Sequence, residues 1–359
     1  MIKIQNLSIE QFIKHIHSKK VICFCAGQGF FNLCETFQLA SKILYVVDNY
    51  KSGTYITLEE YEIPVLAVEE MGDEIKDCIL VISTIKYIEE IITQLDKCTV
   101  CNDQVFYVPD LFNNEEDQSK INNENHPIIP KIIHYCWFGN GRIPDDFLRN
   151  IDTWKRYCPD YEIKCWNESN YDINKNKYMK QAYEMKKWGF VPDYARLDIV
   201  NSYGGIYLDT DVELLKSLDA LLQFNLFCGF ENAANIAFGL GFGSVKDNPI
   251  IIKMMESYEG MDFINPDGTL NTIPSPVYQT RDLEETGLIK NGKTQWVQNA
   301  IVLAPEYLAP INEFGYGKPT TKTFSIHHYA ATWYDDRQKK NKDKIIDNYK
   351  YVLKRISDS

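Results

Sequence analysis

The chain has 359 residues, which exceeds one ordinary domain and predicts about two. Hydrophobic residues make up 45% of it and charged residues 25%, values that are typical of a soluble globular protein. Its net charge of −12 argues against a general nucleic-acid-binding protein, so we expect no nucleic-acid partner.

No segment of the sequence suggests secretion or a membrane span. Residues 1–20 lack the apolar stretch of a signal peptide, and no apolar run approaches the ~20 residues that a membrane helix needs. We therefore expect a cytoplasmic protein whose ten scattered cysteines are reduced. Cys98 and Cys101 lack a second pair at zinc spacing, so they predict neither a metal site nor a redox site.

Residues 1–111 alternate apolar strands with helices. Strand-like runs lie at 21–25, 43–47, 63–68, 78–83 and 105–108, and helix-period stretches at 30–40 and 85–95. Apolar strands that alternate with helices are typical of a parallel sheet. We expect a small Rossmann-like α/β accessory domain, which resembles the modules that precede capsule-synthesis enzymes.

Part of a dinucleotide-binding fingerprint occurs in this domain. Gly27 and Gly29 follow the first strand, and Asp48 ends the second, but Asn32 stands where a third glycine belongs. Cofactor binding and a structural or sugar-recognising accessory role both stay open.

A polar stretch at residues 112–127 is predicted to be a linker. The catalytic domain is expected over residues 128–335 and begins with a strand at 132–137. Residues 139–141, Gly-Asn-Gly, turn the chain at the carboxyl end of this strand, where open α/β sheets bind ligands. Trp137 lies at that edge, either as a flat face for a nucleobase or as a core residue.

A helix is expected over residues 194–203, with Asp193 in the N-cap position. Arg196 follows Asp193 by three positions, so both side chains share one helical face. Two interpretations stay open for this pair. It is either a structural ion pair, or Arg196 points at phosphate or sugar while Asp193 accepts hydrogen bonds from sugar hydroxyls.

The stretch that organises the chain is Gly-Gly-Ile-Tyr-Leu-Asp-Thr-Asp-Val-Glu, residues 204–213. If a strand continues through it, then Tyr207, Asp209 and Asp211 point to one side because strand side chains alternate. Two carboxylates that converge favour a divalent cation with oxygen ligands, Mn²⁺ or Mg²⁺, which holds a diphosphate. The tripeptide Asp-x-Asp alone is also compatible with a solvated strand end.

Two further segments bear on the site. Residues 239–244 are rich in glycine, which could let the backbone approach an acceptor or form a bulged strand, and we expect a flexible loop there. His327 and His328 are adjacent, so in a strand only one of them can face the metal.

Three motifs together resemble glycosyltransferase family 32, the group with a sugar-binding region that contains a DXD motif. They are Ile-Pro-Lys-Ile-Ile-His-Tyr-Cys-Trp-Phe-Gly, then Ala-Arg-Leu-Asp-Ile-Val-x-x-Tyr-Gly-Gly-Ile-Tyr-Leu-Asp-Thr-Asp-Val-Glu, and His-His-Tyr-Ala-Ala-Thr-Trp, within residues 128–335. The family includes capsular polysaccharide transferases and Och-type mannosyltransferases, and is distantly related to the clostridial glucosylating toxins. The resemblance implies a GT-A fold, a nucleotide-sugar donor, a divalent metal and retention of anomeric configuration.

The resemblance also assigns roles to individual residues. Trp137 would stack on the base, Asp193 and Arg196 would hold sugar and phosphate, and Trp333 would close over the β-phosphate. The remaining assignments are Tyr207 and Asp209 to ribose and sugar, Asp209, Asp211 and His328 to the metal, and His327 to substrate binding. One departure is Ala331-Thr332, where related sequences often carry Gly-Ser.

The implied reaction pulls a diphosphate from an anomeric carbon, so the metal and Arg196 would stabilise the leaving group. We expect a front-face substitution in which a phosphate oxygen of the donor takes the acceptor proton. The predicted function is transfer of a hexose, from a UDP-sugar or from GDP-mannose, to a surface glycan or a lipid-linked glycan. The alternatives are a transferase that modifies protein and a non-catalytic sugar or nucleotide binder.

The tail at residues 336–359 is rich in lysine and carries an apolar stripe at helical spacing. We expect a helix that packs on its own domain. The alternative is peripheral attachment to the inner face of an anionic membrane.

Overall fold

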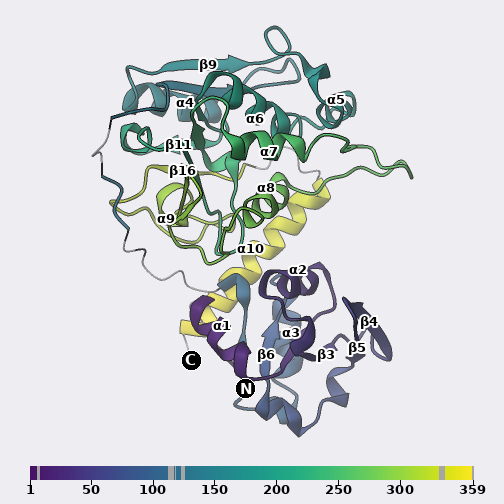
Figure 1. Ribbon diagram of the computed structural model, residues 1–359. Helices are drawn as coiled ribbons and strands as arrows, with labels where there is room; N and C mark the ends of the chain where they lie inside the picture. The colour runs from purple at the N-terminus through teal and green to yellow at the C-terminus, as the bar shows by residue number, and fades with distance from the viewer. Residues whose placement is uncertain (6–8, 112–116, 118, 123–125, 331–335, 358–359) are drawn as a thin grey trace. The chain divides into compact units, whose positions relative to one another are not determined.

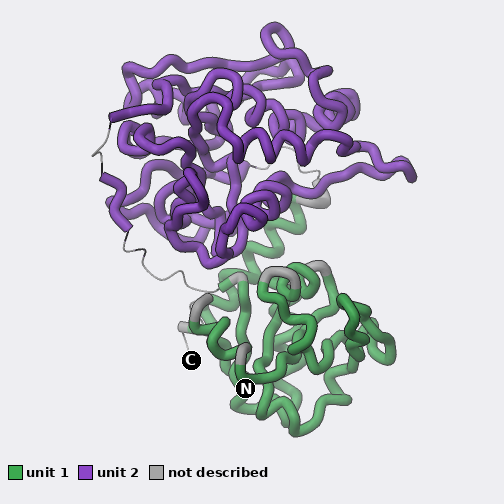
Figure 2. Tube along the Cα trace, viewed as in Figure 1, with its two compact units in different colours: residues 1–115, 335–359 green, residues 116–334 purple. Residues whose placement is uncertain are grey.

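The computed structural model describes residues 1–5, 9–111, 117, 119–122, 126–330 and 336–357. The chain forms two compact units, residues 1–115 with 335–359 and residues 116–334 (Figure 2). Strands and helices are mixed in both units, so the predicted α/β fold class is confirmed. None of the helices in these described ranges is long and apolar enough to cross a membrane.

The first unit is built on a seven-stranded sheet in the order β1-β7-β6-β2-β3-β5-β4. Neighbouring strands are parallel except β4, which runs antiparallel to β5. The strands are β1 (Lys3–Gln5), β2 (Val21–Phe24), β3 (Ile43–Val47), β4 (Thr54–Leu58), β5 (Tyr61–Leu66), β6 (Ile79–Ile82) and β7 (Val105–Tyr107). The helices are α1 (Ile9–Ser18), α2 (Gln28–Phe37), α3 (Ile88–Leu95) and α10 (Asp336–Ser357) (Figure 1).

The central strands β2 and β6 are buried along their whole length, as their unbroken apolar sequences predict. All ten cysteines are free thiols.

The glycine-rich turn after β2 is closed by contacts within the chain. Asp48 accepts hydrogen bonds from the backbone N–H groups of Ala26 (2.9 Å) and Tyr50 (3.0 Å). A Cβ on Gly29 would lie 2.0 Å from the carbonyl oxygen of Ser83, so this glycine allows α2 to approach β6 closely. The carboxylate that a dinucleotide fingerprint would offer to a ribose is thus engaged by the turn itself.

Helix α10 follows the second unit in sequence but packs on α3 and β1 of the first. Tyr349 and Val352 are buried, and Arg355 forms an ion pair with Asp96 at 2.7 Å. Asn348 donates hydrogen bonds to the carbonyl oxygens of Ile85 and Lys86. We expected the tail to pack on its own domain, and the domain to which it belongs is the first unit, because its apolar side chains find their partners there.

The predicted linker at residues 112–127 is only partly a linker. Residues 112–116, 118 and 123–125 lie outside the described ranges. Asp117 is buried and accepts a hydrogen bond from Thr294, and the hydroxyl of Tyr307 donates to the carbonyl oxygen of Ser119 (2.6 Å). The second unit therefore begins before residue 128, because its own side chains satisfy the polar groups of this segment.

The second unit contains a mixed seven-stranded sheet, β14-β15-β12-β13-β10-β8-β9, and a two-stranded sheet, β11-β16. The strands are β8 (Ile132–Cys136), β9 (Glu162–Trp166), β10 (Gly205–Tyr207), β11 (Val212–Leu214), β12 (Leu226–Gly229), β13 (Phe242–Ser244), β14 (Gln295–Val297), β15 (Ala300–Leu303) and β16 (Ser325–His327). The helices are α4 (Asp145–Tyr157), α5 (Lys177–Glu184), α6 (Pro192–Tyr203), α7 (Pro249–Glu256), α8 (Ser275–Glu284) and α9 (Pro305–Leu308).

Two apolar cores cover the two faces of the large sheet. Tyr178 of α5, Leu197 of α6 and Met254 of α7 belong to one core. Trp154 of α4 and Leu308 of α9 belong to the other. The sheet is thus enclosed between helices, which leaves its strand ends as the place where polar side chains can gather.

Candidate active site

The two aspartates of the DXD motif lie in a turn that follows the central strand β10. This strand ends at Tyr207, and the backbone N–H of Val212 donates to the carbonyl oxygen of Asp209 at 3.0 Å before β11 begins. The prediction of one strand through Asp211 was therefore wrong. The two carboxylates still converge, because the turn brings their backbones close together.

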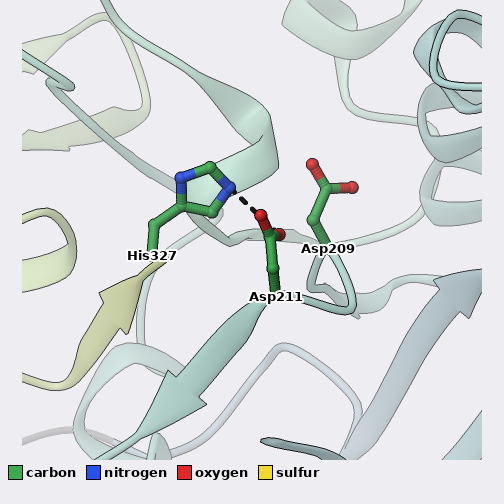
Figure 3. Close-up of side chains that lie close together, drawn as sticks. All are labelled: Asp209, Asp211 and His327. Atoms are coloured by element: carbon green, nitrogen blue, oxygen red, sulfur yellow. Dashed lines mark ion pairs between the residues drawn. The ribbon is translucent and has the colours of Figure 1, made fainter. Parts of the chain in front are cut away.

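The third member of the cluster is His327, at the end of β16. This strand pairs antiparallel with β11 and sets His327 opposite Val212. Nε2 of His327 lies 3.2 Å from Oδ1 of Asp211 (Figure 3). Ligand atoms of Asp209, Asp211 and His327 all lie within 4.8 Å of one another, a spacing that could hold one metal ion.

His328 does not belong to this cluster. Its backbone N–H donates to the carbonyl oxygen of Asp211 (3.0 Å), and its Nε2 lies 3.0 Å from Oε2 of Glu213. Its side chain is 44% exposed, against 13% for that of His327. In this structure the side chain of His327, and not that of His328, lies with the two aspartates, because adjacent residues of an extended chain point in opposite directions.

The ionisation of Asp211 is set by its neighbours. Burial opposes ionisation, but His327 and the backbone N–H of Ala330, at 2.9 Å, outweigh it and lower the pKa of Asp211 to about 2. Burial alone would lower the pKa of His327, yet the carboxylates of Asp211 and Asp209 raise it. Burial, followed by repulsion from Asp211, raises the pKa of Asp209, although Arg196 opposes this.

Arg196 forms a buried ion cluster with Asp193 and Asp209. Its guanidinium lies 3.2 Å from Oδ1 of Asp193 and 3.5 Å from Oδ1 of Asp209, and its side chain is only 6% exposed. It also lies over the ring of Tyr207, 5.2 Å from the centroid. In this structure the guanidinium of Arg196 therefore lies between the carboxylates of Asp193 and Asp209.

Asp193 lies one turn before Arg196 on α6. The helix begins at Pro192, so Asp193 belongs to its first turn and is not the N-cap residue that was predicted. Burial raises the pKa of Asp193 to about 6, although Arg196 and Ser275 lower it. Both side chains are held where the sequence spacing predicted, on one face of the helix.

Gly239 is a site residue that sequence reasoning missed. It belongs to a short 3-10 helix, Phe238–Leu240, and its carbonyl oxygen accepts a hydrogen bond from the N–H of Asp209 (3.4 Å). A Cβ at this position would lie 2.4 Å from Oδ2 of Asp209. The density of glycines at 239–244 was the available signal, and it marked a close approach to the DXD turn.

The imidazole of His134 on β8 was also missed. Its Nε2 lies 2.8 Å from the carbonyl oxygen of Gly204, and its Nδ1 accepts a hydrogen bond from Nε1 of Trp166 at 3.1 Å. These two bonds require the neutral tautomer with hydrogen on Nε2, and burial lowers the pKa of His134 to about 4. His134 thus fixes the glycine at which α6 passes into β10 and the DXD turn.

The remaining predicted residues lie in different environments. Trp137 is half-buried, and its indole N–H donates to the carbonyl oxygen of Gly141 (2.6 Å). Tyr207 is 1% exposed, packs against Phe242 and shares a side-chain hydrogen bond with Asp209. Trp333, like Ala331 and Thr332, lies outside the described residues.

Residues 144–228 match the family described as "glycosyltransferase sugar-binding region containing DXD motif". This match confirms the predicted resemblance. The relatives include inositol phosphoceramide mannosyltransferase 3 of Schizosaccharomyces pombe, 27% identical over 158 residues that cover 42% of this chain and 41% of the relative. Mannosyl phosphorylinositol ceramide synthase SUR1 of Saccharomyces cerevisiae is 28% identical over 152 residues, which cover 41% of this chain and 39% of that protein.

The alignment thus spans about two fifths of the length of these relatives. Among solved structures, the PaToxG glycosyltransferase is similar with a TM-score of 0.36 and 23% identity. That comparison covers 44% of this chain and 69% of PaToxG.

Proposed function

We propose that this chain, which carries a DXD-containing glycosyltransferase sugar-binding region, transfers a hexose from a nucleoside-diphosphate sugar to a hydroxyl group of a glycan. The observation that carries the proposal is the convergence of Asp209 and Asp211, which lie within that region, with His327. Two carboxylates and an imidazole at the carboxyl end of a central strand suit the binding of a metal-bound diphosphate.

The side chains of the cluster fit a divalent cation. Carboxylate oxygens suit Mn²⁺ and Mg²⁺, and imidazole is a competent ligand for Mn²⁺. The Nδ1 atom of His327 is buried without a hydrogen-bond partner among the described residues, while its Nε2 faces Asp211. When bound, the ion would neutralise the charge that develops on the departing diphosphate.

The protein's own groups prepare this site. Arg196 partly offsets the repulsion between Asp209 and Asp211, so both carboxylates can be held close together in their ionised forms. The N–H of Ala330 donates a hydrogen bond to Oδ2 of Asp211, and the other oxygen, Oδ1, faces His327. A site fixed before the substrate binds loses little free energy to reorganisation during the reaction.

The finer features of the reaction are part of the proposal. We expect retention of configuration, with the acceptor hydroxyl attacking on the face from which the diphosphate leaves. The names of the matched relatives favour mannose as the sugar, so GDP-mannose stands beside UDP-hexoses as a candidate donor. A surface glycan, such as capsular polysaccharide, or a lipid-linked glycan is the proposed acceptor, and a protein side chain is the alternative.

The test is a nucleotide-release assay with a panel of UDP- and GDP-sugars, Mn²⁺, and water as default acceptor. The wild type should release nucleotide from one of the donors, and Asp211→Ala should lose this activity together with Mn²⁺ binding, measured separately by calorimetry. An Asp211→Ala protein that turns over normally in EDTA would contradict the proposed site. A wild type that neither binds nor cleaves any donor would contradict the proposed function.

A further inference from the structure

Trp188 is a large aromatic residue at the carboxyl edge of the sheet that the reaction proposed above does not use. It is 37% exposed. A Cβ on Gly139 would lie 2.9 Å from its Cε2 and 3.0 Å from its Cδ2, and the φ of Gly139 is +99°. A residue with a side chain would be strained and would clash here, so the loop after β8 is shaped to receive this indole ring.

Neighbouring side chains hold the indole of Trp188 in place. The ring of Tyr183 on α5 meets the indole nearly edge-on, with centroids 5.1 Å apart and an interplanar angle of 72°. Glu168, which follows β9, accepts a hydrogen bond from the N–H of Gly139 (2.6 Å) and forms another with Tyr183. These contacts therefore hold the indole in place, while more than a third of the residue's surface stays open to solvent.

The position of Trp188 relative to the metal cluster follows from the strand order. β8 lies beside β10, because Tyr207 pairs with His134 and the N–H of Leu208 donates to the carbonyl oxygen of His134 (3.0 Å). The loop after β8 therefore begins about one strand spacing, roughly 4.8 Å, from the chain that leads into the DXD turn. Trp188 packs on this loop, on the side of β9 and α5.

We consider a nucleoside diphosphate whose two phosphates lie at Asp209 and Asp211. The part of this molecule that reaches the loop after β8 is its nucleoside. The half-buried Trp137 donates its indole N–H to the carbonyl oxygen of Gly141, and its ring contacts that of Phe147. Trp188, on the other side of the same loop, offers an additional fixed aromatic surface. Bases stack on such surfaces whatever their hydrogen-bonding edges.

We propose that Trp188 is a stacking residue for the nucleobase of the donor. The assignment rests on the proposed function, and it adds a second aromatic contact to that of Trp137. Because stacking tolerates different bases, Trp188 contributes affinity for nucleoside diphosphates as a class. It does not select between UDP and GDP.

The test compares Trp188→Ala, Trp188→Phe and the control Trp296→Ala by calorimetry with Mn²⁺ and either UDP, GDP or inorganic pyrophosphate. Trp296 is 63% exposed on the distant edge strand β14, so its loss removes an indole without touching the β8 edge. Trp188→Ala should weaken UDP and GDP binding about ten- to hundredfold. Trp188→Phe should retain most of the affinity, and Trp296→Ala should bind both nucleotides as the wild type does.

Pyrophosphate separates stacking from a structural effect, because it contacts the metal site but has no base. Its affinity should be the same in Trp188→Ala and in the wild type. Equal losses of pyrophosphate and UDP affinity, or unchanged UDP affinity, would overturn the assignment. A wild type that binds neither nucleotide would instead overturn the proposed function, and with it this inference.

Discussion

The Nε2 atom of His327 lies 3.2 Å from Oδ1 of Asp211, although one residue comes from the end of β16 and the other from the turn before β11. The antiparallel pairing of these two short strands creates the contact. The neighbouring His328 pairs instead with Glu213 on the more exposed side. Two adjacent histidines thus provide a matched pair of variants.

His327→Ala should abolish transfer and weaken Mn²⁺ binding more than 100-fold. Loss of a residue that only hydrogen-bonds to a metal ligand typically weakens binding about 10- to 100-fold, and loss of a ligand itself should cost more. Titration of Mn²⁺ by calorimetry measures the affinity without depending on activity. His328→Ala is the control and should bind Mn²⁺ like the wild type. Loss of binding in His328→Ala alone would reverse the two assignments.

Gly239→Ala should reduce the rate of transfer about 100-fold, because its Cβ would lie 2.4 Å from Oδ2 of Asp209 and would displace that carboxylate by a large fraction of an ångström. Gly141→Ala is the matched control, since nothing lies within 4 Å of the Cβ it would add. Nucleotide release gives the rates, and circular dichroism checks the fold. Equal rates for both variants would show that Asp209 tolerates displacement.

Arg196→Met should lower the free energy of unfolding by about 3–5 kcal/mol, because it leaves the buried carboxylate of Asp193 and the half-buried carboxylate of Asp209 without their cation. Urea unfolding at pH 7 measures the change. Arg149→Met removes an exposed ion pair with Asp146 and should change it by less than about 0.5 kcal/mol. The double variant Asp193→Asn with Arg196→Met should recover part of the loss, and no recovery would argue against the ion cluster.

His134 should make the protein less stable as the pH falls from about 6.5 to about 4. Its folded pKa of about 4 lies below the unfolded value of about 6.5, so the unfolded chain binds the extra proton in this range. The contribution of His134 to the free energy of unfolding is fully present above pH 6.5. As the pH falls below this value, up to about 1.4 kcal/mol of it is lost per pH unit. Urea unfolding of the wild type and of His134→Gln over this range isolates it, because other groups titrate alike in both. Parallel curves would refute the assignment.

Val352→Asp should destabilise the first unit by more than about 2 kcal/mol, because Val352 is fully buried where α10 packs. Lys350→Asp, at an exposed position two residues earlier, is the control and should have little effect. Hydrogen exchange of β1 and α3 reports on this unit directly. If both variants exchange like the wild type, α10 does not stabilise the first unit.

Local sequence patterns predicted much of the architecture. Apolar runs located β2, β3, β6 and β7 to within a few residues, because buried parallel strands carry continuous hydrophobic sequence. The spacing of Asp193 and Arg196 predicted their shared helical face. The strand expected through Asp211 was wrong, because a short polar turn and a strand end look alike in sequence.

The sequence by itself thus determined the α/β class, the two-part division and the pair of carboxylates, since each depends on residues near one another in the chain. Only the tertiary structure decided that His327 rather than His328 joins them and that Gly239 borders Asp209. It also placed α10 on the first unit. Strand register, a close approach of two backbones and the choice of a packing partner depend on segments far apart in sequence, and no local pattern encodes those distances.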